Sequence, residues 1–143
     1  MKKMVIVPAR GGSKRLPGKN IKLLNGKPLI YHTLDVVVDI FDIIILSTDD
    51  LQILNIGKQH SKKIIPLLRP KELATDTSKV LETVNYLFDN YNKCDQIWLC
   101  LPTCPLREKK DIIDAINLLT IDIDGVVSIT DYEFPPSLGL KKD

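Results

Sequence analysis

The chain has 143 residues, of which 44% are hydrophobic and 27% charged, and its formal net charge is +2. These values are ordinary for a globular protein, and the charge is too small to favour nucleic acid as a partner. At this length we expect one domain, residues 1–143, with a core of its own. No apolar run approaches the ~20 residues of a membrane span, and Pro8 interrupts the first apolar run too early for a signal peptide. We therefore expect no membrane partner and a cytoplasmic location.

Short runs rich in Val and Ile alternate along the chain with helical patterns. The runs predict buried parallel strands, and they cover residues 4–7, 43–46, 97–101 and 126–129. The helical patterns place apolar residues on one face over residues 29–41, 80–91 and 112–119. This βαβ alternation predicts an α/β fold with a mostly parallel sheet flanked by helices.

The first strand runs into a glycine-rich, cationic loop, residues 8–20. Gly11 and Gly12 predict positive backbone φ angles and a close approach to a ligand. Backbone N–H groups in such a loop can converge on an anion. Four cations lie in the same loop: Arg10, Lys14, Arg15 and Lys19. The loop predicts a polyphosphate site, and the alternative is an ordinary surface loop whose cations are solvated.

The spacing of this loop matches neither a Walker A loop nor a Gly-x-Gly-x-x-Gly dinucleotide loop. Two more motifs also follow predicted strands: Ser-Thr-Asp-Asp at residues 47–50 and Pro-Thr-Cys-Pro-Leu-Arg at residues 102–107. Because ligands bind at the carboxyl ends of parallel strands, we expect all three motifs at one edge of the sheet.

Several blocks of the sequence, taken in order, resemble the acylneuraminate cytidylyltransferases, the CMP-N-acetylneuraminate synthetase family. The matching blocks are residues 8–14, 17–20, 26–29, 47–50, 69–70, 72–77, 102–107 and 126–128. The resemblance spans nearly the whole chain and implies a Rossmann-like nucleotidyltransferase fold. Members of the family continue for about another half-domain, so we expect this chain to be a nucleotide-binding α/β domain without the family's C-terminal part.

The resemblance implies that a hydroxyl of a nine-carbon acidic sugar of the sialic acid type attacks the α-phosphorus of CTP. Arg10 and Lys19 match the family's phosphate-binding cations and are the expected catalytic residues, since cations hold the triphosphate and take up charge on pyrophosphate. The expected nucleotide-binding residues are Ala9, Arg10, Gly11, Gly12, Ser13, Lys14, Lys19, Asn20 and Arg69.

The family also implies Mg²⁺ and a homodimer of the full-length protein. The metal ligands are unknown, because the family's metal-binding aspartates fall beyond Asp143. The candidates in this chain are Asp49, Asp50, Asp76 and Asp131.

Two positions depart from the family pattern. Leu101 stands where the family typically has a glutamine that contacts substrate, and Val80 stands where it often has a serine. The expected substrate-binding residues are Leu101, Pro102 and Thr103. Since both departures remove hydrogen bonds, we expect an acceptor other than N-acetylneuraminate, or weaker activity.

Several of these residues also have plainer interpretations. Arg69 fits a salt bridge with Glu72 or Asp76 as well as a nucleotide contact, Ser78 fits a cap on the helix from Val80, and the acidic pair at residues 49–50 fits a helix cap. The cysteines and histidines show no metal spacing and are expected to be structural: Cys94, Cys100, Cys104, His32 and His60. Two other functions stay open: a catalytically incompetent nucleotide-binding module, and a sugar nucleotidyltransferase of other base or sugar specificity.

Overall fold

The computed structural model describes residues 1–75, 77–90 and 94–131. The chain falls into two units, Met1–Lys109 and Lys110–Asp143. The strands are β1 (Lys3–Pro8), β2 (Leu23–Leu24), β3 (Lys27–Pro28), β4 (Ile43–Thr48), β5 (Ile64–Leu68) and β6 (Gln96–Leu99). The helices are η1 (Lys19–Ile21), α1 (Leu29–Val37), α2 (Leu51–His60), η2 (Lys71–Leu73), α3 (Val80–Asn90) and α4 (Lys109–Leu118).

The first unit is built on a four-stranded sheet in the order β5-β4-β1-β6, in which every pairing is parallel. At its centre, Val5 of β1 lies opposite Ile44 of β4 and Trp98 of β6. Strands β2 and β3 form a separate small antiparallel hairpin. The predicted mostly parallel sheet flanked by helices is confirmed.

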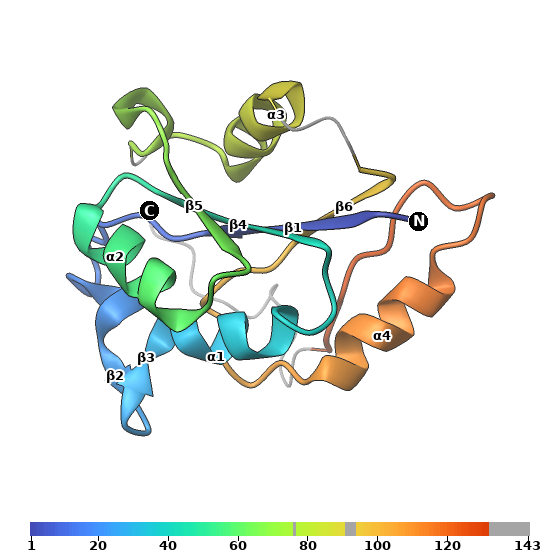
Figure 1. Cartoon of the computed structure of the whole chain (residues 1–143), viewed down its shortest axis with the longest axis horizontal. Helices are drawn as coiled ribbons and strands as arrows, with labels where there is room; N and C mark the ends of the chain where they lie inside the picture. Colours follow the sequence, from blue (N-terminus) through green and yellow to red (C-terminus); the bar gives the residue numbers. More distant parts are fainter. Residues whose placement is uncertain (76, 91–93, 132–143) are drawn as a thin grey trace, which may run out of the picture. The chain divides into compact units, whose positions relative to one another are not determined.

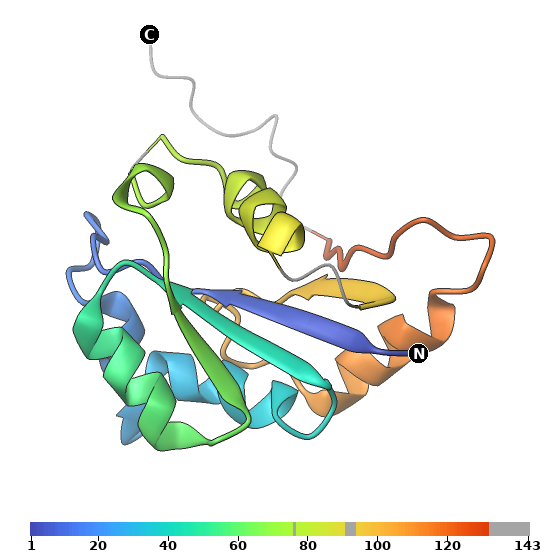
Figure 2. The same ribbon diagram turned by 45° about the horizontal axis from the view of Figure 1, so that its top comes forward.

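Helices cover both faces of the sheet, with α3 on one face and α1 and α2 on the other (Figures 1 and 2). On the α3 side, Leu87 packs in one buried cluster with Met4, Ile6 and Ile45. On the opposite side, α2 approaches β4 so closely that a Cβ at Gly57 would lie 2.1 Å from Cδ2 of Leu46. Because both faces are covered, β1 and β4 are almost continuously apolar, which is why their sequences were recognisable as strands.

The sequence did not predict β5 or α2. Strand β5 is an edge strand that contains Pro66 and leaves Leu68 52% exposed, so it lacks a continuous buried Val/Ile run. In α2 only Ile53, Leu54 and Gly57 are buried, and the apolar pattern is correspondingly short.

The strand predicted at residues 126–129 is wrong, because these residues form no strand in the described part of the chain. Val127 and Ile129 are 82% and 94% exposed. An apolar run becomes a strand only where a neighbouring strand takes up its N–H and C=O groups. The other predicted strands differ from the observed ones by one or two residues at their ends, while the helix predicted from Leu29 ends at Val37 and Tyr91 lies outside the described residues.

Across the described residues, no helix combines the length and the apolar character that a bilayer crossing requires.

Candidate nucleotide site

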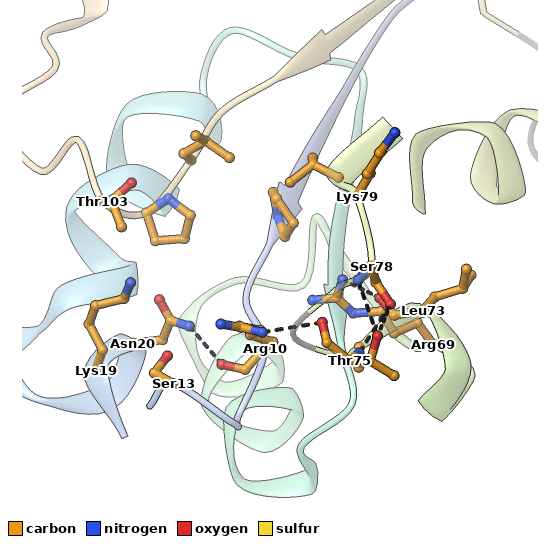
Figure 3. Close-up of a pocket in the computed structure, with 15 residues that line it drawn as sticks. Arg10, Ser13, Lys19, Asn20, Arg69, Leu73, Thr75, Ser78, Lys79 and Thr103 are labelled. Carbon is orange, nitrogen blue, oxygen red and sulfur yellow. Dashed lines mark hydrogen bonds between the residues drawn. The ribbon is translucent and has the colours of Figure 1, made fainter. Parts of the chain in front are cut away.

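A cavity of about 320 Å³ opens at the carboxyl ends of the parallel strands (Figure 3). Its walls come from the loop after β1, the segment after β5 and the segment after β6, as expected for a ligand site in a parallel sheet. The predicted residues that meet here are Arg10, Ser13, Lys19, Asn20, Arg69, Leu101, Pro102 and Thr103.

The charged side chains that line this cavity are all positive. Its walls carry the cations Arg10, Lys19, Arg69 and Lys79, and no Asp or Glu is among the described residues that line it. A neighbouring, more open cavity of about 410 Å³ is lined by Gly11, Gly12 and Lys14 together with Ala74 and Thr75. Ala9, the remaining predicted residue, is fully buried and lines neither cavity. The two cavities suit an extended anion, because cations gathered in a concave site focus a positive potential.

Gly11 is needed for a reason other than the predicted one. Gly11 and Gly12 do not have positive φ angles; in this loop that conformation occurs at Gly18, with φ of 64°. A Cβ at Gly11 would lie 2.6 Å from Oδ2 of Asp50, whereas a Cβ at Gly12 would meet nothing within 4 Å. Gly11 is therefore required by close packing against the segment after β4.

The acidic pair after β4 supports that packing. The backbone N–H of Gly11 donates to Oδ1 of Asp49 at 2.9 Å. Oδ1 of Asp50 accepts from the N–H groups of Gln52 and Ile53, at 2.7 and 3.1 Å, and so caps α2. The helix-cap interpretation is confirmed for Asp50.

The residues that the structure describes do not assemble a metal site. Among the described residues, no group of three or more His, Cys, Asp or Glu side chains is placed to hold a metal ion. Asp76 lies outside the described residues. Asp49 and Asp50 each have one carboxylate oxygen engaged in holding the backbone.

Arg10 connects the two sides of the cavity. Its Nη1 donates to the carbonyl of Thr75 at 3.2 Å, and its own carbonyl accepts from Nδ2 of Asn20 at 3.0 Å (Figure 3). Asn20 is buried, so its amide ties the end of the loop to its beginning. This tie holds Lys19 beside Arg10 in one wall.

Arg69 lies deeper in the wall, with 7% of its surface exposed. Its Nη1 donates to Oγ1 of Thr83 at 3.1 Å and to the carbonyl of Leu73 at 3.4 Å, and its Nη2 donates to the carbonyl of Ser47 at 3.4 Å. Burial lowers the pKa of Arg69, Asp49 opposes this shift, and Arg10 adds to it. Within the described residues no salt bridge to Glu72 forms, and the alternative partner Asp76 is not described.

The segment between β5 and α3 is closed by hydroxyl groups. Oγ of Ser78 accepts from the N–H of Thr75 at 3.1 Å and donates to the carbonyl of Glu72 at 2.8 Å. The predicted cap by Ser78 is therefore wrong. Instead, Oε2 of Glu82 accepts from the N–H of Lys79 at 3.1 Å, which is one half of a capping box.

The segment after β6 presents Leu101 to the cavity, with 36% of its surface exposed. The carbonyl of Leu101 accepts from the N–H of Cys104 at 3.3 Å and from Nη2 of Arg107 at 3.4 Å, and these bonds close a turn. The three cysteines are free thiols, as expected, and burial raises the pKa of Cys100.

Sequence reasoning missed two residues that matter at this site, Lys79 and Thr83. Lys79 lines the cavity just before α3, and the only signal for it was a cation close to the motif at residues 72–77. Thr83 looks like an unremarkable helical residue in the sequence, and only the fold places it against Arg69.

Comparisons with known proteins define first the fold and then the family. The structure of a CMP:2-keto-3-deoxy-manno-octonic acid synthetase complexed with CTP superimposes with a TM-score of 0.69 and 21% identity, over 82% of this chain and 46% of that one. This likeness shows that the chain shares the fold of that synthetase.

The family model named Cytidylyltransferase matches residues 4–120, and the chain belongs to this family. It is 38% identical to the CMP-N,N'-diacetyllegionaminic acid synthase of Legionella pneumophila, over 96% of this chain and 61% of the relative. It is 35% identical to an N-acylneuraminate cytidylyltransferase of Streptococcus agalactiae, over 96% of this chain and 34% of the relative. The resemblance to acylneuraminate cytidylyltransferases is thus confirmed, and the chain spans between a third and two thirds of the length of these relatives.

Proposed function

We propose that the chain is the nucleotide-binding part of a cytidylyltransferase that transfers CMP from CTP to a nine-carbon acidic sugar and releases pyrophosphate. The observation that carries this proposal is the cavity at the carboxyl edge of the sheet, where four cations converge without a lining carboxylate, in a chain of this family. A triphosphate is the ligand that such a charge distribution fits.

In the proposed reaction, a hydroxyl oxygen of the sugar forms a bond to the α-phosphorus while the bond from that phosphorus to the pyrophosphate oxygen breaks. The hydroxyl proton passes to solvent. Arg10 and Lys19 hold the phosphates in line and take up the charge that develops on pyrophosphate, with Lys14 assisting from the adjoining cavity. Arginine suits this role because its fork can engage two phosphate oxygens, whereas lysine acts as a point charge.

Other members of the site contact the nucleotide without charge. Ser13 lines both cavities, and Gly11 and Gly12 let the backbone approach the phosphates because no side chain intervenes. Ala9 is buried beneath the loop and supports it. Asn20 and Arg69 complete the wall on either side of Arg10.

The acceptor sugar belongs on the side of the cavity formed by Leu101, Pro102 and Thr103. Leu101 offers this side an apolar surface instead of the hydrogen-bonding glutamine of the family pattern. The relatives named above are named for different acids, and in this proposal Leu101 contributes to the acceptor preference of this chain.

The proposal includes Mg²⁺ as the counterion of the triphosphate, because a divalent cation on the phosphate oxygens lowers the charge barrier to attack. A cytoplasmic location and a homodimer of the full-length protein are further parts of it, and no nucleic-acid or membrane partner is proposed. The second candidate is a nucleotide-binding module without catalysis, favoured by the absence of a metal-binding cluster among the described residues.

Calorimetry with CTP and Mg²⁺ tests the nucleotide site. Arg10→Ala and Lys19→Ala should each weaken CTP binding by about 1–3 kcal/mol, the cost of a lost charged hydrogen bond. Lys58→Ala removes the same kind of charge from the end of α2, away from the cavity, and should leave the affinity unchanged. Wild-type affinity for CTP in all three variants would refute the site. Tighter binding of UTP or ATP than of CTP would refute the choice of base.

Formation of CMP-sugar tests catalysis. The 143-residue chain is compared with a version extended to the length of its relatives, each with Mg²⁺ and a panel of nine-carbon acids. We expect nucleotide binding by both and turnover by the extended version. Binding without turnover in both versions would favour the non-catalytic module.

A further inference from the structure

Arg69 is held in place by three separate parts of the fold. The carbonyl of Ser47 comes from β4, the carbonyl of Leu73 comes from η2, and the hydroxyl of Thr83 comes from α3. Thr83 is 1% exposed, and it lines neither cavity. Its hydroxyl reaches the site through the hydrogen bond to Arg69.

The three bonds leave part of the guanidinium unused. Both N–H groups of Nη1 are engaged, by Thr83 and Leu73, and Nη2 is engaged by Ser47. Nε is buried and has no partner among the described residues, although Arg69 lines the cavity. A buried donor without a partner is costly, and a ligand with acceptor oxygens or nitrogens would satisfy it.

The orientation of the guanidinium thus decides which N–H donors Arg69 presents to a ligand in the cavity. Its donors form a rigid planar fork, so a rotation that breaks one bond redirects all of them. No carboxylate among the described residues holds this fork, and the two carbonyl contacts are long at 3.4 Å. The bond to Thr83, at 3.1 Å, is the shortest of the three and the one made by a side chain.

We propose that Thr83 is a positioning residue for nucleotide binding: its hydroxyl fixes the Arg69 guanidinium so that the unused donors meet the bound nucleotide. A residue of α3 that does not touch the ligand would then control affinity for it. This inference rests on the proposed function, because it requires Arg69 to contact the nucleotide.

Calorimetric titration with CTP tests the inference in two backgrounds. Thr83→Val keeps the shape of the side chain and removes the hydroxyl, and Thr83→Ser keeps the hydroxyl and removes a methyl group. We expect Thr83→Val to weaken CTP about fivefold, in line with the loss of one hydrogen bond to a charged group, and Thr83→Ser to stay within about twofold of wild type. In an Arg69→Met background, Thr83→Val should cause no further loss. Thr83→Ala serves the same comparison if the valine variant does not fold.

A purely structural role for Thr83 would give a different pattern. It would lower CTP affinity equally with and without Arg69, and this result would overturn the inference. Wild-type affinity of Thr83→Val alongside a weakened Arg69→Met would also overturn it while leaving the proposed function intact. Unchanged affinity of Arg69→Met would overturn it too, and Arg10→Ala in the same series then decides whether the proposed function fails with it.

Discussion

Two arginines line the same cavity and are held in different ways. Arg10, in the loop after β1, is half-buried and reaches across to the carbonyl of Thr75. Arg69, in the segment after β5, is almost fully buried and held by three bonds. The two environments favour different roles: a half-buried cation can shift onto a bound anion, whereas a buried one presents its donors in a fixed direction.

The largest effect is expected where the loop after β1 rests on the acidic pair. In Gly11→Ala the new Cβ would lie 2.6 Å from Oδ2 and 2.8 Å from Cβ of Asp50, so the loop must shift. Overpacking of this kind costs about 1–3 kcal/mol, and we expect CTP affinity to fall about tenfold or more by calorimetry. Gly125→Ala is the matched control, because its Cβ has open space and Gly125 lines neither cavity. Equal affinities of the two variants would show that the position of the loop does not matter for binding.

The stability of two arginine variants tests the comparison directly. Arg69→Met leaves the hydroxyl of Thr83 and the carbonyls of Leu73 and Ser47 without their donor, so we expect a loss of about 1–3 kcal/mol in urea unfolding. Arg10 is half-buried and donates to the carbonyl of Thr75, so Arg10→Ala should cost less than Arg69→Met, under about 1 kcal/mol. A stability gain in Arg69→Met would mean that the cost of burying its charge exceeds the value of its three bonds.

The cap beneath the first loop should have a moderate effect. Asp50→Ala removes the acceptor for the N–H groups of Gln52 and Ile53, and we expect a loss of about 1 kcal/mol in the free energy of unfolding. Asp50→Asn retains a capping oxygen and should lose much less. If both variants unfold like wild type, the cap contributes nothing to stability.

The smallest effect concerns Asp35 of α1, which binds Lys27 of the hairpin and, at 2.7 Å, Nε2 of His60 in α2. Burial acts to raise the pKa of Asp35, but hydrogen bonds from Lys27 and His60 outweigh it and hold the pKa below 3.8. Because the pKa is lowered on folding, this stabilisation is present above pH 3.8 and is lost as the pH falls through the lower folded value.

The carboxylate of Asp35 is partly exposed, so solvent screening limits its contribution to under about 1 kcal/mol. Urea unfolding at pH 7 and pH 3 should show a smaller pH dependence in Asp35→Asn than in wild type. An identical pH dependence would mean that the contacts with Lys27 and His60 do not contribute to stability.

The strands at the centre of the sheet could be predicted, because burial on both faces requires continuous apolar runs that can be recognised in the sequence. Four consecutive residues of β1 and four of β4 are Val, Ile, Leu or Met, and the two strands occupy the middle of the sheet. The apolar pattern of strand β5 is weaker, since its position at the edge of the sheet tolerates Pro66 and an exposed leucine. The apolar run at residues 126–129 led to a wrong prediction, because apolar composition does not say whether a partner strand is present.

For the site, the sequence by itself determined the family, the cationic loop and the edge of the sheet where the motifs meet, because these depend on local motifs and their order along the chain. Only the tertiary structure decided that Gly11 is needed for packing against Asp50, that Asp50 caps α2, and that Arg69 is buried against Thr83. Each of these depends on contacts between residues 14 to 39 positions apart or on the hydrogen bonds that a side chain chooses among several neighbours. The sequence shows which residue types are available. The distances between these residues, which decide their roles, are set only when β4, η2 and α3 pack together.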